Sequence, residues 1–343
     1  MNAGPFETDA IIIGAGPVGL FAVFELGLLD LKCHVIDVLP RAGGQCAELY
    51  PDKPIYDIPG IPVISGQDLT DRLMEQIKPF HAQFHLGQQA QSLSKNKDGR
   101  WQITTDQGTV LIAPAVVIAA GAGTFVSKRP HLAGLEHYEG KSVFYAVANN
   151  EMFRGKTVLI AGGGDSALDW TIALAPIAKS LTLVHHRDGF RASPHAVAQM
   201  RELAAHGKIS FHVASVGALH GANGKLEAVT LRSDEKGEWR EAADIFMPFF
   251  GLTIKLGPIA EFGLDLHENR IPVDTEKFES TTPGIFAIGD IAHYPGKLKL
   301  ILCGFHEAAL MAQAVFRICR PNEKLRFQYT TTSTSLHKKL GVS

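Results

Sequence analysis

Cysteine is scarce in this chain, and the four cysteines are widely separated, at Cys33, Cys46, Cys303 and Cys319. No C-x-x-C pair occurs, so the sequence predicts neither a disulfide framework nor a thiol pair that cycles between dithiol and disulfide. A lone thiol such as Cys46 is expected to be a small packed residue. We therefore expect a reducing compartment and a cytoplasmic protein.

Excess positive charge and long apolar runs are also missing. The 33 Lys and Arg residues stand against 35 Asp and Glu, for a net charge of −2, and the basic residues form no long tract. We therefore expect no nucleic-acid partner. The first ten residues contain no Lys or Arg, and glycines and a proline interrupt the apolar run after Ala10. Neither a signal peptide nor a membrane span is expected.

What the sequence does contain is one pattern that occurs twice. At 343 residues the chain is long for a single hydrophobic core, so we expect two domains. Residues 10–37 and 157–184 both read as a buried strand, a glycine-rich turn, a largely apolar helix and a second strand. Each such βαβ unit is half of a doubly wound nucleotide-binding fold. The chain is therefore predicted to have two nucleotide sites.

The first glycine turn, Gly14-Ala15-Gly16-Pro17-Val18-Gly19, has the G-x-G-x-x-G pattern between a strand and a helix. The glycines permit a tight turn, a close approach to a pyrophosphate and close helix packing, and the helix N-terminus favours negative charge. Asp37 follows at the end of the next strand, near the usual spacing of about 20 residues for a carboxylate that binds a ribose hydroxyl.

The second glycine turn, from Gly162 through Gly164 to Asp165, Ser166 and Ala167, lacks that terminal acid. The chain instead reads His185-His186-Arg187-Asp188-Gly189-Phe190-Arg191. Cations at this position suit a 2′-phosphate, which favours NADP over NAD. A solvated basic turn without a ligand is the alternative. Ser166 lacks the G-x-S-x-G frame of an esterase nucleophile.

Two crossings between domains are predicted from the buried strand at 116–123 and from the stretch at 249–252. The predicted fold is α/β, with two Rossmann-like, doubly wound, three-layer nucleotide-binding domains. Residues 123–249 form the second domain, inserted into a first domain made of residues 1–122 and 250–343.

Five features in order resemble the motif set of the thioredoxin reductase family: Gly43-Gly44-Gln45, Ala119-Ala120-Gly121, the Gly162 turn, the run at 185–191, and Gly289-Asp290. The chain departs from that family where it reads Tyr145-Ala146-Val147-Ala148 in place of C-x-x-C. With Leu49-Tyr50-Pro51 and the C-terminal tail, it resembles the thioredoxin-reductase-like ferredoxin–NADP reductases of bacteria, within the class II pyridine nucleotide-disulfide oxidoreductases.

That resemblance implies FAD at the first turn, NADP(H) at the second, an acidic ferredoxin as partner, and a homodimer. It also implies that the inserted domain rotates across hinges near Gly121–Gly123 and Phe250–Leu252. Tyr50 and Tyr329 are predicted to stack on the flavin, with no side chain acting as acid or base and no metal. The predicted FAD residues are Gly14, Gly16, Pro17, Gly19, Asp37, Gln45, Tyr50, Ala90, Gly289, Asp290 and Thr330. The predicted NADP residues are Gly162, Gly164, Asp165, Ser166, His186, Arg187 and Arg191.

Several points stay open or secondary. A flavodoxin, a quinone or a low-molecular-weight disulfide remains possible as acceptor, and so does a nucleotide sensor without turnover. His81 and His85 lack a third ligand and are interpreted as an exposed helix end. The predicted ferredoxin-docking residues are Lys297, Lys299, Arg326, Lys338 and Lys339.

Overall fold

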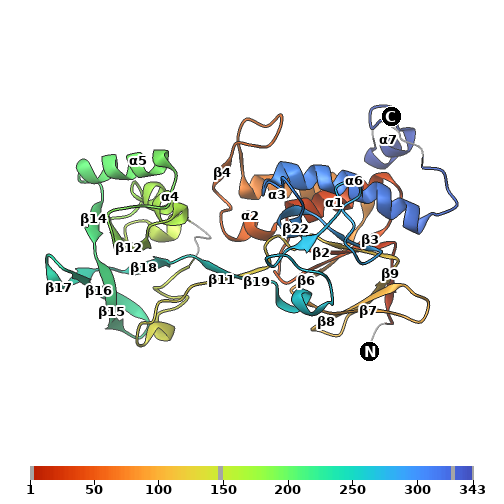
Figure 1. Cartoon of the computed structure of the whole chain (residues 1–343). Helices are drawn as coiled ribbons and strands as arrows, with labels where there is room; N and C mark the ends of the chain where they lie inside the picture. The colour runs from red at the N-terminus through yellow and green to blue at the C-terminus, as the bar shows by residue number, and fades with distance from the viewer. Residues whose placement is uncertain (1–3, 146–149, 326–328, 342–343) are drawn as a thin grey trace. The chain divides into compact units, whose positions relative to one another are not determined.

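The structure is a computed structural model, and it describes residues 4–145, 150–325 and 329–341. The chain divides into two compact units. Unit 1 contains residues 1–124 and 254–343, and unit 2 contains residues 125–253. Figure 1 shows this division by colour, because unit 1 holds both ends of the colour range and unit 2 its middle. The predicted boundaries lie within four residues of these.

Unit 1 is built around a five-stranded parallel sheet. Its strands, in spatial order, are β21 (Ile285–Ala287), β10 (Ala115–Ile118), β2 (Ala10–Ile13), β3 (Cys33–Asp37) and β6 (Gln83–Leu86). Every residue of β2 and β10 is buried, as expected for parallel strands covered on both faces. The C-terminal segment of the unit therefore supplies an edge strand of the sheet.

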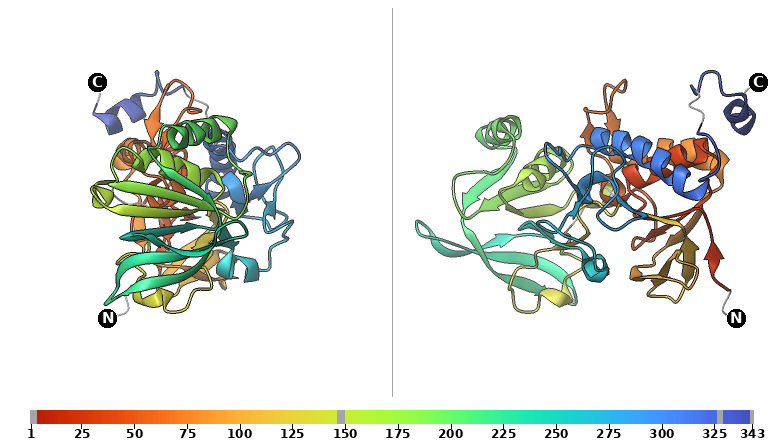
Figure 2. Two further views of the ribbon diagram at one scale, coloured as in Figure 1. Left: turned by 90° about the vertical axis from the view of Figure 1, so that its left-hand side faces the viewer. Right: turned by 45° about the vertical axis from the view of Figure 1, so that its right-hand side comes forward.

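The two faces of this sheet are covered by different layers, which Figure 2 shows in its right-hand view. Ala10 and Ile12 belong to a core formed with α1 (Pro17–Leu28), α3 (Gly66–Ile77) and α6 (Ile301–Cys319). Ile11 and Ile13 pack on the opposite face, in a second core. That face carries a four-stranded sheet of β1 (Phe6–Glu7), β9 (Val110–Ala113), β8 (Trp101–Thr105) and β7 (Ala90–Lys95).

Among the described residues, α6 is the only helix long and apolar enough to meet a length-and-composition test for a membrane span. It packs on α1, and its residues Ala308, Met311, Ala312 and Val315 lie in the core of unit 1. These contacts are those of a core helix.

The shorter elements of unit 1 connect these layers. They are α2 (Gly44–Glu48), β4 (Pro54–Ile55), β5 (Ile64–Ser65), η1 (Lys78–Phe80), η4 (Gly257–Glu261), β20 (Ile271–Pro272), η5 (Gly289–Ile291), β22 (Ala292–His293) and α7 (Thr334–Leu340).

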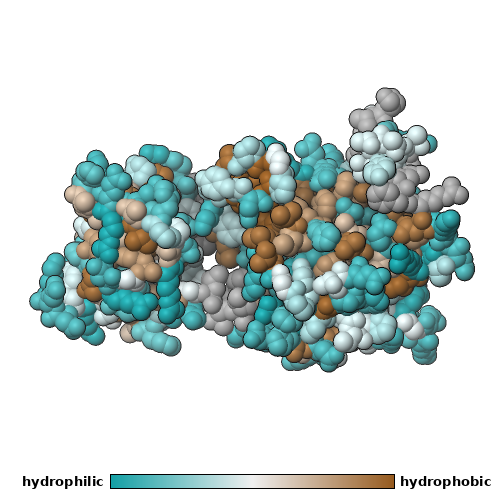
Figure 3. Space-filling view, turned by 45° about the horizontal axis from the view of Figure 1, so that its top comes forward, coloured by the Kyte–Doolittle hydropathy of each residue, from teal (hydrophilic) through white to brown (hydrophobic). Residues whose placement is uncertain are grey.

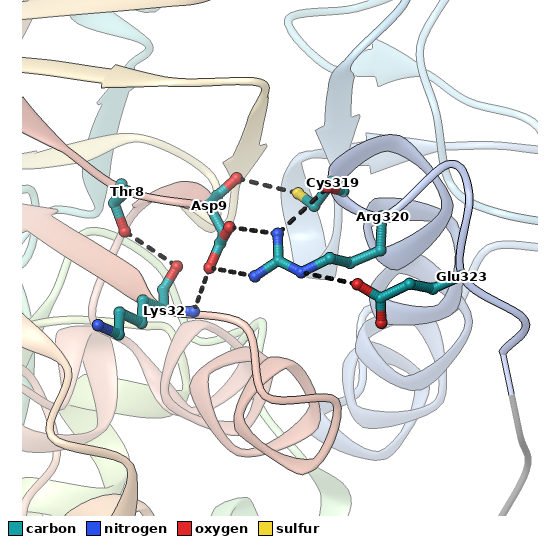
Figure 4. A network of polar contacts seen from close by, with 6 residues as sticks. All are labelled: Thr8, Asp9, Lys32, Cys319, Arg320 and Glu323. Atoms are coloured by element: carbon teal, nitrogen blue, oxygen red, sulfur yellow. Dashed lines mark hydrogen bonds and ion pairs between the residues drawn. The ribbon is translucent and has the colours of Figure 1, made fainter.

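A polar network joins the two chain segments of unit 1 (Figure 4). Arg320, at the end of α6, donates to Asp9 Oδ1 over 2.9 Å, and the other carboxylate oxygen of Asp9 accepts from the Lys32 N–H at 2.9 Å. The network thus ties the end of α6 to the residues just before β2 and β3.

Unit 2 repeats the plan with its own sequence. Its parallel sheet contains β14 (Ser210–Val213), β13 (Ser180–His185), β12 (Thr157–Gly162) and β18 (Ile245–Phe249). Val158 and Ile160 pack with α4 (Asp165–Leu174) and α5 (Pro194–Ala205), whereas Leu159 faces the other layer. That layer is an antiparallel sheet of β15 (Ser215–Ala222), β16 (Lys225–Ser233) and β17 (Gly237–Ala242).

The two chain crossings pair with each other. β11 (Thr124–Ser127) and β19 (Leu252–Lys255) form a two-stranded sheet, and the Lys128 N–H donates to Gly251 O at 2.9 Å. Two short 3₁₀ segments, η2 (Leu135–His137) and η3 (Asn150–Phe153), complete unit 2. The backbone near the crossings is thus hydrogen-bonded between the two passes of the chain.

Candidate dinucleotide sites

The first glycine turn lies between β2 and α1, and two of its glycines have no room for a side chain. Gly14 has φ +113°, and a Cβ there would lie 2.3 Å from the Ala119 carbonyl oxygen. A Cβ on Gly19 would lie 1.9 Å from the Gly14 carbonyl oxygen. Because both obstacles are backbone atoms, neither contact can be relieved by moving a side chain. These glycines are required by the fold of the turn itself.

Gly16 differs from them, because it has room for a side chain. The nearest atom to a Cβ on Gly16 is the Gly44 Cα, at 3.9 Å. Gly16 is also the N-cap of α1, and it has no side-chain cap hydrogen bond. A helix N-terminus that has no side-chain acceptor and is approached by bare backbone fits a pyrophosphate. Pro17 supplies the first residue of the helix, where its missing N–H costs nothing.

The Gly43-Gly44 turn forms the other wall of this cradle. The Gly43 N–H donates to the Ala15 carbonyl at 2.8 Å. Gly44 has φ +54°, and a Cβ there would approach the Gly16 Cα to 2.9 Å. The two glycine segments are therefore in backbone contact, a closeness that the separate motifs did not predict.

Asp37 ends β3 and binds the same turn. Its Oδ2 accepts from the Ala15 N–H at 2.6 Å, and its Oδ1 accepts from the Leu39 N–H at 2.8 Å. Burial raises the pKa of Asp37, and the two backbone hydrogen bonds lower it in part. Each carboxylate oxygen accepts more than one hydrogen bond, so both keep capacity for a ribose hydroxyl.

Ala90, a predicted FAD residue, lies close to this strand end. It is buried at the start of β7, and the Gln88 N–H, two residues earlier, donates to the Asp37 carbonyl at 3.0 Å. The structure thus brings Ala90 near Asp37.

Gln45 and Tyr50, two predicted FAD residues, both belong to the segment that follows the Gly43-Gly44 turn. The Gln45 Nε2 is 3.2 Å from the position of a Cβ on Gly121, so Gln45 lies beside the turn that follows β10. The hydroxyl of the half-buried Tyr50 lies 3.6 Å from the Cys46 sulfur. Burial raises the pKa of Tyr50, and Cys46 and Asp290 raise it further, which places Asp290 within electrostatic range. Cys46 is buried, in agreement with a packed thiol.

Gly289 is held by a buried carboxylate that the sequence did not reveal. Glu307, on α6, has no exposed surface, and its Oε2 accepts from the Gly289 N–H at 2.6 Å. Its Oε1 accepts from the Tyr294 hydroxyl at 2.7 Å and from the Lys297 ammonium.

The contact with Glu307 contradicts the prediction that Lys297 helps to dock ferredoxin. The side chain of Lys297 is only 2% exposed and paired with Glu307, so the assignment of Lys297 to a docking surface is wrong. The cause is a partner on another element, which a search for scattered surface cations cannot detect.

The remaining predicted docking residues have different surroundings. Lys299 and Lys338 are exposed, whereas Lys339 pairs with Asp30. Arg326 lies outside the described residues.

The C-terminal tail lies away from Tyr50 in the chain as described. Tyr329 is 69% exposed, and the Thr330 carbonyl contacts His337 Nε2 at 3.1 Å. His337 belongs to α7, which contacts η1, and Lys339 of α7 reaches the Gly27 carbonyl near the C-terminal end of α1. The glycine turn and Tyr50 lie at the other end of α1, a helix of 12 residues and thus about 18 Å long. Tyr329 and Thr330 are not brought beside Tyr50.

The second glycine turn has the same frame but different neighbours. A Cβ on Gly162 would lie 2.6 Å from the Phe249 carbonyl, and one on Gly163 would lie 2.2 Å from His185 Nε2. Gly164 is the N-cap of α4 without a side-chain cap hydrogen bond. A second helix N-terminus is therefore free of a side-chain acceptor at the cap.

The predicted cations lie at this turn. The Arg191 N–H donates to the Gly163 carbonyl at 2.7 Å, and the Ser193 N–H donates to Asp165 Oδ1 at 2.9 Å. The remaining predicted residues, Ser166, His186 and Arg187, are exposed, as is the side chain of Arg191. The strand end thus presents cations to solvent beside the glycines.

The histidines interpreted as a helix end are placed differently. His81 follows η1 in a left-handed conformation, but His85 lies in strand β6, so the helix interpretation is wrong for it. His85 Nε2 is 2.9 Å from His34 Nδ1, a pairing across the sheet that the sequence gave no sign of.

Among the described residues, no group of three or more His, Cys, Asp or Glu side chains could hold a metal ion. Tyr145 donates to Glu139 Oε1 at 2.7 Å, whereas Ala146, Val147 and Ala148 lie outside the described residues.

Two βαβ frames, each with an open glycine turn at an uncapped helix N-terminus, define an α/β protein with two dinucleotide-type sites. The sequence model of the pyridine nucleotide-disulphide oxidoreductase family matches residues 8–311. Two solved structures share the fold. Thioredoxin reductase of Lactococcus lactis has a TM-score of 0.73 at 23% identity, over 92% of this chain and 99% of that one. Bacillithiol disulfide reductase of Staphylococcus aureus has a TM-score of 0.70 at 17% identity, over 90% and 98%. The predicted fold class is confirmed.

Curated relatives narrow the family. The chain is 62% identical to a ferredoxin–NADP reductase of Parvibaculum lavamentivorans over the full length of both. It is 60% identical to one of Bradyrhizobium sp. over 98% of each chain. The chain belongs to the ferredoxin–NADP reductases of the pyridine nucleotide-disulphide oxidoreductase family, and the resemblance drawn from its motifs is confirmed.

Proposed function

We propose that this chain is an FAD-dependent ferredoxin–NADP(+) reductase. FAD, when bound, supplies the chemistry that couples hydride transfer with NADPH to one-electron transfer with ferredoxin. The observation that carries the proposal is the contrast between the two strand ends, where one carries a buried carboxylate and the other exposed cations. The names of the full-length relatives support the same activity.

In unit 1 the residues present fit FAD. Gly16 leaves open backbone at the helix N-terminus for the pyrophosphate, and Asp37 holds the turn while keeping capacity for a ribose hydroxyl. Asp290 would bind the ribityl end, and Tyr50 would stack on the ring. The tail places Tyr329 beside α7, so Tyr329 reaches a flavin only if the tail moves or if it serves a second chain.

In unit 2 the residues present fit NADPH. The turn at Gly162 and Gly164 would bind the pyrophosphate, and Arg187 and Arg191 would bind the 2′-phosphate, since guanidinium groups pair well with phosphate oxygens. These residues bind and orient. No side chain is assigned the role of acid or base.

Ferredoxin is proposed to dock through exposed cations of unit 1, of which Lys299 and Lys338 are the candidates. Transient redox complexes are small, so charge steering matters more for them than buried area.

A cytoplasmic homodimer is also proposed. All four cysteines are free, which suits a reducing compartment. Figure 3 shows brown apolar surface between polar side chains. Large apolar residues of unit 1 that are well exposed and suit a contact between copies include Tyr56, Val63 and Leu298.

The test is NADPH-dependent reduction of cytochrome c by the purified protein, with and without added ferredoxin, beside an assay with thioredoxin. We expect a yellow protein with one FAD per chain, a large stimulation by ferredoxin and no thioredoxin reduction. A colourless protein without turnover would favour a nucleotide sensor. Turnover that ferredoxin does not stimulate would favour another acceptor.

A further inference from the structure

One carboxylate lies inside the basic run at the second strand end. Asp188 follows Arg187 directly, and its side chain is 58% exposed. A free carboxylate here would repel a 2′-phosphate, and it would also accept a hydrogen bond from the 2′-hydroxyl of NADH. The run therefore contains a group that opposes the selectivity of its own arginines.

Arg201, on α5, neutralises this carboxylate. Its guanidinium donates to Asp188 Oδ1. The same guanidinium lies over the rings of Phe190 and Phe211, at 5.5 and 5.4 Å from their centroids. Aromatic faces on two elements thus hold a planar cation in place, a role for which arginine is better suited than lysine.

These contacts extend to the glycine turn. The His185 ring stacks on Phe190, with centroids 5.5 Å apart and an interplanar angle of 29°. His185 in turn fills the space beside Gly163. A continuous column of side chains therefore connects Arg201 to the turn that would bind the pyrophosphate.

We propose that Arg201 determines coenzyme specificity by occupying Asp188, which leaves Arg187 and Arg191 unopposed at the 2′-phosphate. It is a positioning residue, since it acts through Asp188. This inference rests on the proposed preference for NADPH.

A purely structural role predicts something different. An exposed ion pair contributes little to folding stability, so the loss of Arg201 should cost the fold little beyond its ring contacts. The main effect of losing Arg201 should instead be electrostatic, as weaker binding of the 2′-phosphate. It should change the ratio between the affinity for a ligand with a 2′-phosphate and the affinity for one without it. A purely structural role would weaken both affinities equally.

The experiment measures calorimetric binding of 2′,5′-ADP and of 5′-ADP to the purified full-length protein. Arg201→Gln should lower the preference for 2′,5′-ADP about fivefold, the size expected for one unit charge near a doubly charged phosphate in water. Arg201→Lys keeps the charge and should retain most of the preference. The double variant Arg201→Gln/Asp188→Asn removes the unpaired carboxylate and should restore the preference to within about twofold.

Arg232→Gln is the matched control, because Arg232 forms a similarly exposed ion pair with Glu238 in the antiparallel sheet of unit 2. It should leave the ratio unchanged. Equal weakening of both ligands by Arg201→Gln, or no rescue by Asp188→Asn, overturns the inference. If the wild-type protein binds both ligands equally, the proposed NADPH preference fails instead. Thermal unfolding of each variant identifies any that fold poorly. If Arg201→Gln is one of them, Arg201→Lys is used instead, and loss of its preference for 2′,5′-ADP overturns the inference.

Discussion

The two glycine turns share a βαβ frame, but the strand beside the first ends in a carboxylate and the strand beside the second is followed by cations. In unit 1 the second strand ends in Asp37, which is 9% exposed and holds two backbone N–H groups. In unit 2 it ends in His185, buried against Gly163, followed by cations that face solvent. We propose that the frame provides a pyrophosphate site in each unit, and that the strand end determines which dinucleotide binds.

The comparison also separates two kinds of glycine. Gly14 and Gly19 are required because backbone atoms occupy the place of a side chain, whereas Gly16 has room for one. In unit 2 the obstacle at Gly163 is a side chain, the His185 ring. Each turn therefore has a glycine fixed by backbone, since the obstacle at Gly162 is the Phe249 carbonyl, whereas Gly163 is limited by a side chain.

The largest effect is expected from Gly19→Ala. The new methyl group would meet the Gly14 carbonyl at 1.9 Å, so we expect a loss of about 3 kcal/mol or more in the free energy of unfolding, and loss of FAD. Gly16→Ala is the control within the same turn. It should fold normally but bind FAD more weakly, because its methyl group stands where the pyrophosphate approaches. Denaturant unfolding and FAD titration of the two variants separate these effects, and equal destabilisation would contradict the distinction.

Asp37→Asn tests the strand end of unit 1. Asparagine can accept from only one of the two backbone N–H groups at Ala15 and Leu39, so FAD affinity should fall about tenfold to a hundredfold. Binding of NADP(+) should not change. Asp274→Asn is the control for the change of charge alone, since the Oδ1 of that exposed carboxylate accepts from both the Glu276 and the Lys277 N–H. FAD binding that survives Asp37→Asn unchanged would remove Asp37 from the site.

Lys299→Glu tests whether ferredoxin docks on unit 1 and not on unit 2. We expect ferredoxin-dependent turnover to slow by a factor of roughly two to ten, with the difference from wild type shrinking as salt rises from ~0.01 to ~0.1 M. Reduction of a small neutral acceptor should be unchanged. Lys208→Glu, on the exposed surface of unit 2, should have no effect. If both acceptors slow equally with Lys299→Glu, the docking proposal fails.

The smallest effect concerns acid sensitivity in unit 2. Burial, followed by the neighbouring His186, lowers the pKa of His185 from 6.5. The stabilising contribution of neutral His185 is therefore fully present above pH 6.5 and is lost as the pH falls below it. His185→Gln should cost more stability at pH 8 than at pH 5, with a difference below about 1 kcal/mol. Denaturant unfolding at the two pH values measures it, and a constant difference would contradict the shift.

Local pattern was sufficient to predict the fold class. A buried strand, a glycine turn and an apolar helix are read from neighbouring residues, and both βαβ frames were predicted in this way. The antiparallel sheet of unit 2 was not predicted, since most residues of its strands are exposed or half-buried and the strands show no long apolar run.

Contacts between distant segments could not be predicted. Lys297 looks like a surface cation until Glu307, on α6, is placed against it. The same holds for Arg201 and Asp188, which belong to different elements. The roles of the predicted site residues remain predictions, because they depend on ligands and not on the fold.

The most direct test of the central claim is an anaerobic titration of the FAD absorbance with NADPH, in the wild-type protein and in the variant Arg187→Ala/Arg191→Ala. We predict that both proteins retain FAD, because these arginines belong to unit 2. Loss of one charge-assisted hydrogen bond costs about 1.5–3 kcal/mol, so the variant should need at least about tenfold more NADPH for the same bleaching, with its response to NADH unchanged. Loss of FAD from the variant, or equal weakening with NADPH and NADH, would contradict the assignment of the two turns to two different dinucleotides.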